Sequence, residues 1–179
     1  MNQTASNYGQ ALYDLAKDEA VAATVLSQLL ALQTGIEAEP TFIRLLSTPT
    51  LSKQERCRIV DESFGGKVHP YVLNFLKILT ERGAMRHFSD CCSAYETLYN
   101  RDHGILVVTV VSSLELTEQQ QSNLQTKLSS LTGKHIRLRC RIDPAVLGGI
   151  RLDYDGKQVD DTLSARLDTI GKLLKNTVL

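Results

Sequence analysis

The hydrophobic periodicity of this chain changes once, near residues 101–104. Before that point apolar residues recur at three- and four-residue steps, the spacing of one face of an α-helix. After it the chain continues with Ile105-Leu-Val-Val-Thr-Val-Val111, whose β-branched side chains favour a strand covered on both faces. One such change in a chain of 179 residues fits two small domains. We predict a boundary at Gly104, which gives domains 1–104 and 105–179.

Six helical segments are predicted in the first domain, and signals for helix ends separate them. Gly35 is typical of the end of the second helix, and Pro49 limits the third. Ser52 and Glu55 have the spacing of a capping box, and Pro70 opens the fifth helix. The sixth helix carries a packed stripe: Met85, Phe88, Cys92, Tyr95 and Tyr99. The short links between these segments predict an antiparallel bundle of six helices.

The second domain begins with the strand predicted at 105–111, and a helix follows it. Thr117 and Gln120 have capping-box spacing at the start of this helix, and Gly133 is placed to end it. The helix carries three leucines at helical spacing: Leu124, Leu128 and Leu131.

Residues 135–142 alternate strictly between apolar and polar side chains, as a half-exposed strand does. One side of this strand carries Ile136, Leu138, Cys140 and Ile142. A further strand is predicted at 150–152, and Asp155-Gly156 is a hairpin turn signal. Thr162 is placed to cap a final helix. The predicted fold is therefore mainly α, with a six-helix bundle followed by a small α/β domain.

Composition excludes several functional classes. Lys and Arg total 20, as do Asp and Glu, so the chain lacks the broad basic field that nucleic-acid binders use to neutralise phosphates. No apolar run approaches the ~18 residues that span a bilayer. The first residues, Met1 to Ser6, resemble neither a signal nor a transit peptide. The four cysteines lack Cys-x-x-Cys spacing, so we expect reduced thiols in a cytosolic protein.

No constellation of residues indicates an active site. Gly148-Gly149 lacks the spacing of a phosphate-binding loop and is interpreted as a bulge or a close backbone approach. His87 and Cys91 share one helical face, but a fourth metal ligand has no candidate at motif spacing. Turn chemistry and helix capping explain the acidic group, which comprises Asp153, Asp155, Asp160 and Asp161. We therefore expect no enzyme, no metal and no cofactor.

The polar side of the strand at 135–142 carries three guanidinium groups, Arg137, Arg139 and Arg141. Such a row is able to grip carboxylates or phosphates. No exposed aromatic residue alternates with the arginines, as a nucleic-acid platform would require. We therefore favour a face directed to solvent or to an acidic partner over one that binds nucleic acid.

The fifth helix has more apolar surface than an ordinary surface helix. At ~100° per residue, its apolar positions cover an arc of roughly 220°, beyond the ~100° stripe that faces a core. These positions are Val72, Leu73, Phe75, Leu76, Ile78 and Leu79. The first helix, with Tyr8, Leu12 and Leu15 on one stripe and alanines beside them, would allow an incoming helix to approach closely. Periodicity alone favours full burial and a partner-binding groove equally.

Four segments, in this order, resemble the delta subunit family of bacterial F-type ATP synthases, the counterpart of the mitochondrial oligomycin-sensitivity-conferring protein. They are Tyr8-Gly-Gln-Ala-Leu12, Phe42-Ile-Arg-Leu-Leu-Ser-Thr-Pro49, Asn74-Phe-Leu-Lys-Ile-Leu79 and Asp143-Pro-Ala-Val-Leu-Gly-Gly-Ile150. The last two are fairly specific to the family, and the segments cover nearly the whole chain. The departures from the family pattern are surface, cap or turn changes, at Thr48, Arg56, Glu115 and Asp161-Thr162.

The resemblance implies a non-catalytic stator subunit that binds two partners. The bundle would receive the N-terminal helix of an alpha subunit between its first and fifth helices, and the second domain would engage the two b subunits of the peripheral stalk. The chain would keep the catalytic head from rotating with the rotor during proton-driven ATP synthesis. It would lie at the cytoplasmic face of the bacterial inner membrane, held there only through the complex.

Mapped onto this sequence, the resemblance places eight residues in the groove for the alpha-subunit helix. These are Tyr8, Ala11, Leu12, Leu15, Val72, Phe75, Leu76 and Leu79. Two other readings of the chain remain: an adaptor that binds RNA through the strand at 135–142, and a small enzyme with its site between the domains.

Overall fold

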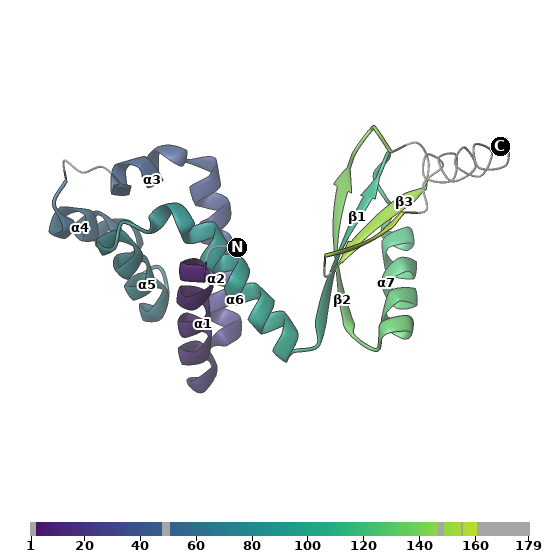
Figure 1. Ribbon diagram of the computed structural model, residues 1–179, viewed down its shortest axis with the longest axis horizontal. Coiled ribbons are helices and arrows are strands. Elements are labelled where there is room, and N and C mark those ends of the chain that lie inside the picture. Colours follow the sequence, from purple (N-terminus) through teal and green to yellow (C-terminus); the bar gives the residue numbers. More distant parts are fainter. Residues whose placement is uncertain (1–2, 48–50, 147–148, 155, 161–179) are drawn as a thin grey trace, which may run out of the picture. The chain divides into compact units, whose positions relative to one another are not determined.

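The computed structural model describes residues 3–47, 51–146, 149–154 and 156–160. The chain divides into two compact units, Met1–Tyr99 and Asn100–Leu179, and the division falls within helix α6 (Phe88–Asp102). The described residues form seven α-helices and a four-stranded sheet, so the chain is mainly helical (Figure 1). Among them, no helix combines the length and the apolar character needed to cross a bilayer.

Helices α1 to α6 and a short 3₁₀ turn, η1, precede the sheet (Figure 1). Their bounds are α1 Gln3–Asp18, α2 Ala22–Ala38, α3 Pro40–Ser47, α4 Lys53–Phe64, α5 Pro70–Glu81, η1 Met85–His87 and α6 Phe88–Asp102. The predicted capping box of α4 is confirmed: the Ser52 hydroxyl accepts from the Glu55 backbone N–H at 3.2 Å, and the Glu55 carboxylate accepts from the Ser52 N–H at 2.9 Å. Pro70 occupies the first turn of α5, where it removes no helical hydrogen bond.

The predicted end of the second helix at Gly35 is wrong. Helix α2 continues through Gly35 to Ala38. An isolated glycine costs a helix about 1 kcal/mol relative to alanine, which packing can offset. Ile36, the next residue, is buried in the core and holds this last turn in place.

The core of the first unit collects buried side chains from all of its helices. The predicted stripe of the sixth helix is buried at Met85, Phe88, Cys92 and Tyr95. The Tyr95 hydroxyl donates to the Ala22 carbonyl oxygen at 3.0 Å, so its polar end is satisfied.

On α1 the buried positions are Ala5, Gly9, Leu12, Tyr13 and Ala16, a stripe that differs from the predicted one of Tyr8, Leu12 and Leu15.

The second unit is a sheet of strand order β2-β1-β3-β4. The strands are β1 Ile105–Ser112, β2 His135–Ile142, β3 Ile150–Tyr154 and β4 Lys157–Asp160, and helix α7 is Glu118–Thr132. Strands β1 and β2 are parallel, which requires a crossover connection, and α7 supplies it. Strand β3 pairs antiparallel with β1 and with β4. The Thr117–Gln120 capping box is confirmed, and Gly133 ends α7 in the left-handed region at φ 67°.

Helix α7 covers one face of the sheet through Leu124 and Leu128, which pack on a cluster that contains Leu106, Val108 and Val110. The alternation predicted for residues 135–142 holds at Ile136, which is buried, but Ile142 at the far end of this edge strand is 55% exposed. The predicted hairpin fits the pairing of Tyr154 with Lys157. Asp155 and the predicted final helix after Thr162 lie outside the described residues.

Gly9 brings α1 against α6 more closely than any side chain would allow. A Cβ atom at this position would lie 2.7 Å from the Cβ of Ala94 and 2.7 Å from the carbonyl oxygen of Cys91. Backbone atoms cannot move aside as a flexible side chain does, so the contact requires glycine.

We predict that Gly9→Ala lowers the free energy of unfolding by about 1–2 kcal/mol, because the overlap outweighs the gain in helix propensity. Gly35→Ala is the matched control, since a Cβ there meets nothing within 4 Å. It should raise the free energy by about 0.5–1 kcal/mol. Urea unfolding of both variants measures this, and equal stabilisation by the two substitutions would contradict the close contact at Gly9.

Candidate partner-binding surface

The eight residues predicted to line a groove fall into a buried set and an accessible set. Helices α1 and α5 contact each other in the first unit. The buried set has exposed fractions of 6% or less and consists of Leu12, Val72, Phe75, Leu76 and Leu79. Phe75 also lies against Phe88 of α6, with ring centroids 6.4 Å apart. These five side chains hold α1 and α5 in the core of the first unit, so they lie beneath its surface.

The accessible set lies on the outer side of α1. Ala11 is exposed, Leu15 is 44% exposed and Tyr8 is half-buried. Positions 8, 11 and 15 are spaced i, i+3 and i+7, so they share one face of the helix. An apolar face of this kind, left open to water, is the form in which a helix receives another helix.

Helix α5 contributes one residue that was not placed in the groove. Ile78 is 45% exposed, and Leu73 is half-buried. The wide apolar arc of α5 predicted more apolar surface than an ordinary surface helix has. Residue spacing did not show which of its residues would remain exposed. We call Tyr8, Ala11, Leu15 and Ile78 the exposed α1–α5 set.

Polar contacts connect α4 to the exposed side of α5. The Lys77 ammonium lies 2.6 Å from an Asp61 carboxylate oxygen. Both groups are partly exposed, so water screens the pair, and its net contribution is about 1 kcal/mol or less. The Cys57 thiol lies 3.7 Å from a Glu81 carboxylate oxygen, and partial burial, followed by the Glu81 charge, raises the pKa of Cys57.

The described residues hold no group of three or more His, Cys, Asp or Glu side chains arranged to bind a metal ion. His87 lies 3.9 Å from Asp90, and Cys91 is buried. Burial raises the pKa of Cys91 to about 11 and also raises that of Cys92. Both groups therefore remain thiols at neutral pH, whereas a nucleophile or metal ligand needs the thiolate.

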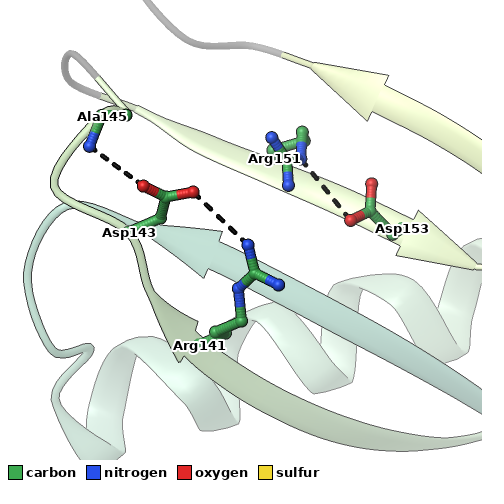
Figure 2. A network of polar contacts seen from close by, with 5 residues as sticks. All are labelled: Arg141, Asp143, Ala145, Arg151 and Asp153. Atoms are coloured by element: carbon green, nitrogen blue, oxygen red, sulfur yellow. Dashed lines mark hydrogen bonds and ion pairs between the residues drawn. The ribbon is translucent and has the colours of Figure 1, made fainter.

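Figure 2 shows Arg141 of β2 and Arg151 of β3 on the sheet face away from the helix, each beside an aspartate. Ile136 and Leu138 pack in the cluster under α7, so by strand alternation Arg137 and Arg139 lie on the opposite face. Arg141 lies 3.4 Å from Asp143, whose other oxygen accepts from the Ala145 N–H at 3.0 Å. On the neighbouring strand Arg151 lies 3.5 Å from Asp153.

These pairs reduce the positive field of the face. Tyr154, the aromatic residue of β3, packs in the apolar cluster under α7 and does not stack beside the arginines. The arrangement therefore does not favour the RNA-binding reading.

The turn that follows β2 explains one of the matching sequence segments. Asp143 stabilises the turn through the Ala145 N–H, and Gly149 takes φ 79°, which favours glycine. The described residues of this segment, at its two ends, thus have structural roles beside the sheet. A family model described as "ATP synthase delta (OSCP) subunit" matches residues 4–174 of the chain.

The chain belongs to the ATP synthase delta (OSCP) family. A relative from Gloeobacter violaceus, an ATP synthase subunit delta, is 31% identical over 171 residues, covering 92% of this chain and 90% of its own. Another from Alkaliphilus oremlandii is 29% identical over 172 residues, covering 96% of both. The predicted resemblance is confirmed.

The fold is also found in a solved ATP synthase. A chain in the cryo-EM structure of the Toxoplasma gondii mitochondrial ATP synthase hexamer matches with a TM-score of 0.79 at 19% identity, covering 97% of this chain and 98% of that one. Delta (OSCP) subunits are structural parts of the F-type ATP synthase and belong to its stator. The chain is therefore a stator-type subunit of this membrane-associated complex.

We predict that substitutions in the buried set lower the free energy of unfolding much more than substitutions in the exposed α1–α5 set. Phe75→Ala should lower the free energy of unfolding by about 3–5 kcal/mol, because it leaves a cavity against Phe88. Ile78→Ala should change it by less than about 1 kcal/mol, because Ile78 is already half in water. Urea denaturation of both variants checks the assignment, and similar losses for the two would show that the placement of α5 is wrong.

Proposed function

We propose that this chain is the non-catalytic link between the catalytic head and the peripheral stalk of the ATP synthase. Its first unit acts as an antiparallel six-helix bundle that receives the N-terminal helix of an alpha subunit against α1 and α5. Its second domain, residues 105–179, engages the b subunits. By joining the two, the chain keeps the head from rotating with the rotor during proton-driven ATP synthesis.

The observation that supports this proposal most strongly is the exposure of Leu15 and Ile78 on two helices that contact each other. A large apolar side chain that is 44% or 45% exposed in the isolated chain gains from burial by a partner. The buried set directly beneath keeps both helices fixed, so little ordering is required on binding.

A stator link requires a long-lived contact and no reactive group. Its interfaces must outlast the turnover of the complex, and affinity gained from apolar anchors acts mostly by slowing dissociation. An amphipathic helix supplies such anchors at i, i+3, i+4 and i+7. The exposed α1–α5 set offers the complementary surface.

We further propose that the chain lies at the cytoplasmic face of the bacterial inner membrane and is held there through its partners. Its relatives in Gloeobacter violaceus and Alkaliphilus oremlandii support a bacterial setting.

We predict that Leu15→Asp and Ile78→Asp each weaken binding of an alpha-subunit N-terminal peptide by about tenfold or more, because a carboxylate then replaces an apolar contact. Leu45→Asp on α3 is the matched control, since Leu45 is 43% exposed and lies on neither helix. It should change the affinity by less than about twofold. Calorimetric titration of the three folded variants measures the peptide affinity. Equal losses of affinity at Leu15, Ile78 and Leu45 would show that the peptide does not bind at the exposed α1–α5 set.

A further inference from the structure

A second apolar surface lies apart from α1 and α5. It is a pocket of about 460 Å³ that opens to solvent between α2, α3 and the end of α4. Its apolar wall consists of Leu32, Ile36, Phe42, Phe64 and Val68. The rings of Phe42 and Phe64 meet edge to face at 5.7 Å and form one side. This volume and lining are typical of sites for small organic molecules.

Gly35 lies in the wall of this pocket, inside α2. A Cβ atom there would meet nothing within 4 Å, so no neighbour in the described residues requires glycine. The position also lacks a positive φ, which would be another reason for glycine. Alanine would stabilise the helix, so helix stability does not favour glycine here, and the missing side chain leaves open space at the backbone in the pocket wall.

One end of the pocket presents hydrogen-bond donors. The side-chain oxygen of Gln28 accepts from the His69 backbone N–H at 2.7 Å, and its NH₂ group remains a donor in the pocket lining. Lys67, two residues before His69, places its ammonium on the exposed rim, where it donates to the Ser63 carbonyl oxygen at 3.0 Å. Neither donor is used by a carboxylate among the described residues, so both are available to an anionic group.

The opposite end carries a negative charge. Glu39 directly follows the end of α2 and lies about three helical turns beyond Gln28, a distance of about 16 Å at 1.5 Å per residue. Its carboxylate accepts from the Thr41 hydroxyl at 3.4 Å. The apolar wall lies between the two ends, so the pocket has a donor end, an apolar middle and an acidic end.

We propose that this pocket binds an amphipathic carboxylate, such as a medium-chain fatty acid, with its head at Gln28 and Lys67. Its hydrocarbon body lies along Gly35 between Leu32 and Phe42. An ammonium head is disfavoured at the donor end because Lys67 repels it. None of the residues that line the pocket belongs to α1 or α5, so this site is additional to the proposed helix-binding surface.

The test is calorimetric titration of the full chain with decanoate, decylammonium and decan-1-ol, each below about 1 mM. We expect decanoate to saturate one site. Decylammonium can place its head only at the acidic end near Glu39, so Lys67→Gln should not weaken its binding. Lys67→Gln should weaken decanoate binding by about fivefold and leave decan-1-ol unchanged, because only the charged head contacts the ammonium.

Gly35→Leu fills the pocket and should weaken binding of decanoate and decan-1-ol by at least about tenfold. The thermal unfolding midpoint of this variant shows whether it is folded, and Gly35→Ala reports the effect of a small side chain. Absence of saturable binding by the wild-type chain would overturn the proposal. So would unchanged binding to folded Gly35→Leu, or unchanged decanoate binding to folded Lys67→Gln.

Discussion

The burial of one side of α5 is the constraint on which the first unit depends. Val72, Leu76 and Leu79 are fully buried, and Phe75 reaches Phe88 of α6. Because these contacts occupy the inner side of the helix, Ile78 is left on the outer side. The same division occurs on α1, where Leu12 is buried and Leu15 is not. A rigid core thus presents apolar side chains to water at fixed positions, which is what a binding surface for a preformed helix requires.

Two groups of side chains in the described residues are constrained by their surroundings. The buried cysteines are held as thiols, and the charged groups of the sheet face oppose one another in pairs such as Arg151 with Asp153. A subunit that transmits torque works through the lifetime of its contacts, and apolar burial extends this lifetime without any covalent step. The membership of the chain in the ATP synthase delta (OSCP) family makes it a stator-type subunit.

Local signals predicted the elements of the fold well, because each depends on a few neighbouring residues. The capping boxes at Ser52 and Thr117 and the strand from Ile105 are examples. The end of α2 was not predicted, since packing of Ile36 overrides the local preference of Gly35. The groove could be predicted only as a set of candidates. On a helix with a 220° apolar arc, periodicity cannot show which side meets the core, and only the packed structure separates Phe75 from Ile78.

The central claim is that the exposed residues of α1 and α5 tie the head to the stator, whereas the buried ones only hold the fold. The most direct test uses ATP synthase reconstituted in vesicles with the Leu15→Asp, Ile78→Asp double variant. The account predicts that ATP hydrolysis continues while ATP-driven proton pumping is lost, because an unheld head turns with the rotor. Pumping at the rate of the Leu45→Asp control complex would contradict it.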